Sequence, residues 1–271
     1  MKYGFVKVAA AIPLVKVADC QFNAQQTSKL IVEADSKGVQ VIIFPELNLT
    51  GYSCGDLFGQ TLLLEQAEIA LMQVMNETRQ LDIISIVGMP VVVNSTLMNC
   101  AVVCQRGKIL GIVPKTYLPN YKEFYEQRWF APSTAHADDE MVRICGQHVP
   151  VSSDLIFEST DLCFGVEICE DVWATIPPSS HLALKGADVI FNMSADPKIS
   201  VSISICVLCW HSSLLVVWLD MFLLLLDLES LLLMSFLQET LLFMRTEHYW
   251  LLPNASHLKN SWLSVKLISN V

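Results

Sequence analysis

The sequence predicts an α/β fold, because short β-branched and apolar runs alternate with longer segments of helical periodicity. Three of the apolar runs, residues 39–46, 111–115 and 163–169, end in Glu46, Lys115 and Cys169. Side chains at strand ends face the ligand in α/β sheets, so we expect these three to meet at one site. The 271 residues suit one large domain, or two smaller ones, with ample core.

The elements are predicted from periodicity and from turn residues. In chain order we expect a strand at 1–11, a helix at 23–37, a strand at 39–44, a helix at 62–81, a strand at 83–93, a hairpin at 99–105 and 108–114, a polar excursion at 131–155, a buried strand at 163–168, a short helix at 179–185 and a strand at 187–193. Gly38 is expected to end the first helix, and Gly88 and Pro90 to break the strand at 83–93. Arg106 and Gly107 form the predicted hairpin turn.

A glutamate, a lysine and a cysteine together suit acyl transfer from an amide or nitrile carbon to water. A cysteine attacks as its thiolate, so it needs a base or a cation beside it. Glu46 can take the thiol proton, and Lys115 can stabilise the thiolate and the oxyanion of a tetrahedral intermediate. Each residue alone also has an ordinary interpretation, as an inert buried cysteine, a helix-start carboxylate and a loop charge. Spacing by itself leaves both interpretations open.

Three motifs resemble the nitrilase, or carbon-nitrogen hydrolase, superfamily: Phe44-Pro45-Glu46, Pro114-Lys115 and Glu167-Ile168-Cys169-Glu170-Asp171. The flanking residues 49–58, 115–121, 169–173 and 177–179 are similar to those of the glutaminase domains of glutamine-dependent NAD+ synthetases. The resemblance covers residues 1–198 and then stops. It implies a nitrilase-type α-β-β-α sandwich that is incomplete at its C-terminal side.

The resemblance also implies roles for single residues. Cys169 would be the nucleophile, Glu46 the general base and Lys115 the lysine on the oxyanion side. Glu126 would orient the lysine, although a helix-surface carboxylate beside Arg128 is the alternative.

Three further positions match residues of that site. Glu170 would support the nucleophile, and Tyr121 and Asp196 would contact the glutamine.

The character of the chain changes after residue 198. No glycine follows Gly186, and residues 201–219 contain no Asp, Glu, Lys or Arg over about the length that spans a bilayer. Scattered Ser, Cys and His and the lack of a basic flank oppose a membrane segment. Codons permitted by residues 199–236 allow a shifted frame that continues the resemblance. We therefore predict that residues 199–271 are an aberrant hydrophobic tail translated out of frame.

The resemblance implies partners outside this chain. The sequence has no Ser-Gly-Gly-x-Asp-Ser loop, GxGxxG or Walker motif, so we expect the synthetase domain to be absent. That domain would use ATP and Mg2+ to amidate deamido-NAD+ with the ammonia released from L-glutamine. The glutaminase step is expected to need no cofactor or metal, and the full-length family implies a homo-oligomer.

Charge and cysteine usage limit the remaining classes. A net charge of −10 without basic clusters argues against nucleic-acid binding. Nine cysteines without a secretory signal indicate a reducing compartment, so we expect the cytoplasm and no membrane association. Two alternatives stay open: a stand-alone nitrilase-type amidase acting on another small amide, and a non-catalytic membrane-anchored fragment.

Overall fold

The computed structural model describes residues 5–135, 140–159 and 162–195, and four strands beyond them at 220–224, 242–245, 248–251 and 261–268. Most of the tail predicted to be out of frame, including residues 201–219, therefore lies outside the described residues. Within the part of the chain that is described, no helix combines the length and the apolar character needed to cross a membrane.

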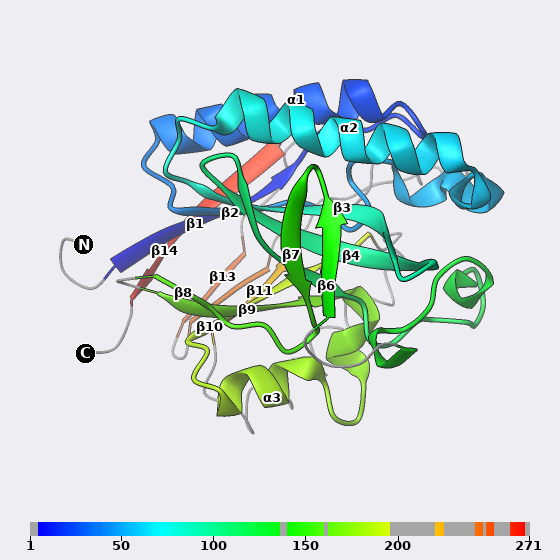
Figure 1. Ribbon diagram of the computed structural model, residues 1–271. Helices are drawn as coiled ribbons and strands as arrows, with labels where there is room; N and C mark the ends of the chain where they lie inside the picture. Colours follow the sequence, from blue (N-terminus) through cyan, green and yellow to red (C-terminus); the bar gives the residue numbers. More distant parts are fainter. Residues whose placement is uncertain are drawn as a thin grey trace.

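Two sheets pack face to face, and helices cover their outer faces (Figure 1). Helices α1 (Cys20–Ser36) and α2 (Thr61–Thr78) lie on the larger sheet, and α3 (Pro178–Leu184) lies on the smaller one. The layers therefore run helix, sheet, sheet, helix, which confirms the predicted α/β sandwich.

The larger sheet has eight strands in the order β14-β1-β2-β3-β4-β5-β7-β6. Their bounds are β1 (Phe5–Ile12), β2 (Val41–Ile43), β3 (Ile84–Val93), β4 (Thr96–Gln105), β5 (Lys108–Pro114), β6 (Glu140–Ile144), β7 (Gln147–Val151) and β14 (Ser261–Ile268). Strands β1, β2 and β3 are parallel, whereas β3, β4 and β5 form an antiparallel meander. The β4–β5 turn places Arg106 and Gly107 at positive φ, as a tight two-residue hairpin requires, so the predicted hairpin is confirmed.

The smaller sheet has four strands in the order β11-β10-β9-β8. Their bounds are β8 (Phe157–Glu158), β9 (Cys163–Ile168), β10 (Val189–Met193) and β11 (Asp220–Leu224); β12 (Leu242–Arg245) and β13 (His248–Leu251) pair separately. Single-turn or short 3-10 segments are η1 (Tyr52–Gly59), η2 (Glu126–Arg128), η3 (Ser133–Ala135) and η4 (Cys169–Trp173). Strands β9, β10 and β11 run parallel, so their carboxyl ends share one edge.

Alternation of side chains along the strands explains how one sheet faces both a helix layer and another sheet. Val8 and Val166 lie in the core between the two sheets, whereas Ala9 lies in the core under the helices. On the other face of β9, Gly165 lies against Leu182 of α3, and a Cβ there would meet the leucine side chain at 2.7 Å. The strands are therefore buried on both faces and read as nearly continuous apolar runs.

Two sequence predictions about the larger sheet are wrong. Strand β3 is not broken, because Pro90 lies beyond the last β3 residue that pairs with β2, Ile86, so its missing N–H removes no bond from that ladder. The polar excursion at 131–155 is also not a simple loop, because β6 and β7 form a hairpin through Cys145 and Gly146 and join the sheet beside β5.

Candidate active site

Glu46 is held by the backbone that follows β2. Phe44 donates its N–H to the carbonyl of Ile86, and the Asn48 side chain accepts the N–H of Gly88 at 2.8 Å. A Cβ on Gly88 would clash with the nitrogen of Leu47 and lie 2.8 Å from the carbonyl oxygen of Pro45. The segment around Glu46 therefore sits directly on β3, and the side chain is 1% exposed.

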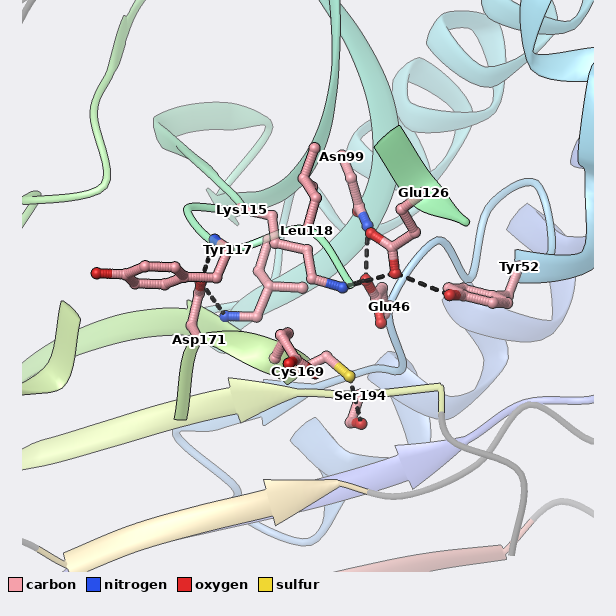
Figure 2. Close-up of polar contacts among 12 residues, drawn as sticks. Glu46, Tyr52, Asn99, Lys115, Tyr117, Leu118, Glu126, Cys169, Asp171 and Ser194 are labelled. Atoms are coloured by element: carbon pink, nitrogen blue, oxygen red, sulfur yellow. Dashed lines mark hydrogen bonds and ion pairs between the residues drawn. The ribbon is translucent and has the colours of Figure 1, made fainter. Parts of the chain in front are cut away.

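Lys115 follows the last residue of β5 and is completely buried. Its N–H donates to the carbonyl of Asn99, which continues the β4–β5 ladder past the proline. Its Nζ lies 2.6 Å from Oε1 of Glu46 and 2.8 Å from Oε1 of Glu126. One ammonium therefore joins two buried carboxylates that are distant in sequence (Figure 2).

Glu126 begins the η2 turn and is 1% exposed, so the helix-surface alternative for this residue is wrong. Arg128, its proposed surface partner, instead pairs with Asp56, with Nε 2.7 Å from Oδ1. The Tyr52 hydroxyl donates to Oε1 of Glu126 at 2.7 Å. Burial, reinforced by Glu126, raises the pKa of Tyr52, so the phenol keeps its proton and acts as the donor.

The electrostatics of this cluster favour a base that works near neutral pH. Burial and, to a lesser extent, Glu126 outweigh the opposing effect of Lys115 and together raise the pKa of Glu46 to about 7. Burial would lower the pKa of Lys115, but Glu46, Cys169 and Glu126 outweigh it and hold that pKa well above its ordinary value. The Asn99 amide donates to Oε1 of Glu46 at 2.6 Å and orients the carboxylate.

Cys169 lies where β9 ends and η4 begins, with φ at +46° and 6% exposure. A non-glycine residue in this left-handed region is held there by its surroundings. The Asn192 amide of β10 donates to the Cys169 carbonyl at 3.4 Å and to Oε1 of Glu167 at 3.3 Å. The Ser194 hydroxyl lies 3.3 Å from the Cys169 sulfur.

The carboxylate of Asp171 ties the lysine strand to the cysteine turn. Oδ1 accepts the backbone N–H groups of Thr116 and Tyr117, at 3.0 and 2.7 Å, and Oδ2 accepts that of Ile168 at 3.0 Å. Burial raises the pKa of Asp171 to about 8, and the hydrogen bonds from Ile168 and Tyr117 oppose that rise. Asp171 therefore binds the two residues that follow Lys115 and the residue that precedes Cys169.

The structure places most, but not all, of the predicted site residues. Figure 2 shows the sulfur of Cys169 beside the cluster of Glu46, Lys115 and Glu126. Tyr121 is exposed, and its hydroxyl donates to both carboxylate oxygens of Glu170, at 3.1 and 2.9 Å. Glu170 directly follows the nucleophile in sequence, whereas Tyr121 comes from the loop after Lys115. Asp196 lies outside the described residues.

Several polar residues of the site were not assigned by sequence reasoning. They are Tyr52, Asn99, Asn192 and Ser194. Asn99 and Asn192 are polar residues within otherwise apolar strands and Ser194 directly follows one, which is a usable signal, whereas nothing local marks Tyr52. Together with the predicted residues they surround one thiol with a carboxylate, a cation and neutral donors. Such a set can take a proton from a thiol and stabilise an oxyanion.

Comparison with known proteins identifies the family of this chain. Residues 7–212 match the carbon-nitrogen hydrolase family. The glutamine-dependent NAD(+) synthetase of Mycobacterium tuberculosis H37Rv is 39% identical over 199 residues, which make up 72% of this chain and 29% of that protein. The corresponding synthetase of Rattus norvegicus is 32% identical over 183 residues, covering 65% of this chain and 25% of that protein. The chain thus spans less than a third of the length of these curated relatives.

Solved structures with the same fold include a glutamine-dependent NAD(+) synthetase and an amidase. The glutamine-dependent NAD(+) synthetase of Cytophaga hutchinsonii superposes with a TM-score of 0.62 at 26% identity, over 71% of this chain and 31% of that chain. An amidase from Nesterenkonia sp. AN1 superposes with a TM-score of 0.65 at 16% identity, over 81% of this chain and 76% of that one, and supports the fold alone. Since the family match covers most of its length, the chain belongs to the carbon-nitrogen hydrolase family of enzymes.

Proposed function

We propose that this chain is a glutamine amidohydrolase, which releases ammonia from L-glutamine through a thioester on Cys169. The observation that carries the proposal is the buried Lys115 ammonium, which joins Glu46 and Glu126 beside a cysteine at a strained strand end. The choice of glutamine rests on the glutamine-dependent NAD(+) synthetases that the chain resembles.

The first half of the proposed reaction forms the thioester. The Glu46 carboxylate takes the proton of the Cys169 thiol, and the sulfur attacks the carbon of the substrate's side-chain amide. Lys115 and the backbone N–H of Glu170 stabilise the oxyanion that forms. Glu46 then gives its proton to the amide nitrogen, the carbon–nitrogen bond breaks, and ammonia leaves.

The second half releases glutamate. Glu46, again ionised, takes a proton from water, and the oxygen attacks the thioester carbon. The tetrahedral intermediate collapses, the carbon–sulfur bond breaks, and the proton on Glu46 returns to the thiolate. One base thus serves both halves, which a pKa near 7 permits because the group must both accept and donate a proton near neutral pH.

Substrate recognition and partners complete the proposal. Tyr121 and Asp196 would bind the glutamine, and Glu170 would support the nucleophile. The ammonia would pass to a synthetase domain that uses ATP and Mg2+ to amidate deamido-NAD+, in a homo-oligomeric full-length protein. The glutaminase step itself would use side chains alone. Free thiols such as Cys20 and Cys100 suit a reducing compartment, so we place the activity in the cytoplasm.

The decisive experiment measures ammonia release from L-glutamine by the chain and by Cys169→Ala. We expect the variant to lose at least about 1,000-fold in rate, because it lacks the nucleophile. Cys163→Ala, at the start of the same strand, is the matched control and should keep the wild-type rate. Full activity in Cys169→Ala would sink the proposed mechanism.

Two further measurements address the alternatives. A glutamine analogue with a diazoketone in place of its amide should add covalently to Cys169, as seen by peptide mass spectrometry. In a panel of amides that includes asparagine and acetamide, a better substrate than glutamine would favour a stand-alone amidase. For the membrane-anchored fragment, extraction of the expressed chain only with detergent would be the supporting result.

A further inference from the structure

Ser194 lies beside Cys169 because of the register of two parallel strands. Ile168, the last residue of β9, pairs with Met193, the last residue of β10. Cys169 directly follows Ile168, and Ser194 directly follows Met193. Both residues therefore lie at the same edge of the sheet. The Ser194 oxygen lies 3.3 Å from the Cys169 sulfur, and the two residues are 1% and 6% exposed.

The separation of the two side chains is fixed by the backbone around them. Two residues before Ser194, the Asn192 amide donates to the carbonyl of Cys169 itself and to Glu167. The end of β10 is thereby attached to the turn that presents the nucleophile. In Figure 2 the sulfur lies between the lysine–carboxylate cluster and Ser194. A hydroxyl so placed can donate a hydrogen bond to the sulfur from the side opposite that cluster.

We propose that Ser194 is a catalytic residue, whose hydroxyl donates a hydrogen bond to the Cys169 thiolate and holds it ready for attack. The inference rests on the proposed nucleophile but not on glutamine as the substrate. Ser194 keeps its own proton throughout, since the thiol proton passes to Glu46. When the sulfur bonds to the substrate carbon it loses its negative charge and becomes a weak acceptor, so the hydrogen bond favours the free thiolate over the adduct.

The test measures how fast iodoacetamide alkylates Cys169 as a function of pH, read from the mass of the peptide that contains Cys169. In Ser194→Ala we expect the midpoint of the pH profile to rise by about one to two units, because a hydrogen bond to a charged group is lost. Above the midpoint the limiting rate should increase by roughly 3- to 10-fold, because a more basic thiolate is more nucleophilic. A merely structural defect would lower the limiting rate and leave the midpoint in place.

Two variants serve as controls. Ser194→Thr keeps the hydroxyl and should return the midpoint toward the wild-type value. Ser85→Ala removes a buried serine hydroxyl of β3 that donates to the Cys104 carbonyl instead, and it should leave the profile unchanged. Thermal melting confirms that each variant is folded.

An unchanged midpoint in Ser194→Ala, or a shift that Ser194→Thr does not reverse, would overturn the inference. The alkylation assay contains no glutamine. If the chain proves not to hydrolyse glutamine, the profile still reports on Ser194 and Cys169, so the two failures are distinguishable.

Discussion

Replacing Glu126 by glutamine tests how the second carboxylate on Lys115 sets the working pH of Glu46. Both hydrogen bonds to Glu126, from Tyr52 and Lys115, go to Oε1, while Oε2 is buried and has no hydrogen-bond partner among the described residues. A glutamine can keep both bonds through its single oxygen. The Glu126→Gln variant therefore removes a charge while leaving the shape of the site almost unchanged.

The size of the effect follows from the geometry. Oxygens of Glu46 and Glu126 contact the same Nζ at 2.6 and 2.8 Å, so the two carboxylates are close neighbours. Two unit charges about 5 Å apart interact by about 3 kcal/mol at an effective dielectric of about 20, which corresponds to about 2 pH units. Glu126 is among the groups that raise the pKa of Glu46 to about 7, so its loss lowers that pKa.

The assay is the pH dependence of kcat/KM for ammonia release from glutamine. Glu46 must be ionised to take the thiol proton, so the wild-type rate should fall as the pH drops below about 7. In Glu126→Gln this acidic limb should move down by about 1 to 2 pH units. Glu123→Gln, at an exposed position of the same loop, should leave the limb in place. A limb that stays fixed or moves upward in Glu126→Gln would refute the electrostatic reasoning.

Two more substitutions test the supports of the site. Gly88→Ala pushes a methyl group into the backbone on both sides of Glu46. A displacement of Glu46 by about 1 Å should lower kcat/KM on the order of 100-fold. Gly59→Ala, where a Cβ would meet open space, should leave kcat/KM unchanged. Asp171→Asn leaves a buried N–H without an acceptor. Because burial raises the pKa of Asp171, the ionised carboxylate destabilises the fold at higher pH, so the loss of the hydrogen bond is measured by urea denaturation at about pH 4, where it should lower the unfolding free energy by about 1–3 kcal/mol. Asp154→Asn, which weakens only a surface ion pair with Lys185, should change it by less than about 1 kcal/mol.

The three central residues were predictable from the sequence because each follows an apolar strand. Side chains at strand ends commonly face a ligand, which made Glu46 and Cys169 candidates, but they follow strands of two different sheets, and the family resemblance was needed to favour a joint site. Glu126 is different, because it lies on a short turn, 11 residues after Lys115, in a segment without periodicity. Only the family resemblance identified it, and only the structure excluded a surface position.

The β6–β7 hairpin escaped prediction for a related reason. In β6 the exposed Met141 and Arg143 alternate with partly buried residues. In β7 histidine, glutamine and proline are typical of a loop. The hairpin is an edge addition to a sheet that is already complete, so tertiary pairing with β5, rather than local propensity, determines it.

Ser194 and Asn192 show what a sequence lacks even when every strand is correctly predicted. The predicted strand at 187–193 contains Asn192 and ends just before Ser194, but which residues lie against Cys169 depends on the register between β9 and β10. A shift of one residue would turn Asn192 away from Glu167 and the Cys169 carbonyl, because neighbouring side chains point to opposite faces. Glu167 accepts hydrogen bonds from Asn192 and from the Ser179 N–H. Its pKa is raised, mainly by burial. The hydrogen bonds of Asn192 to Glu167 and to the Cys169 carbonyl form in the observed register, so the groups that support the nucleophile also help to select the pairing that places Ser194 against its sulfur.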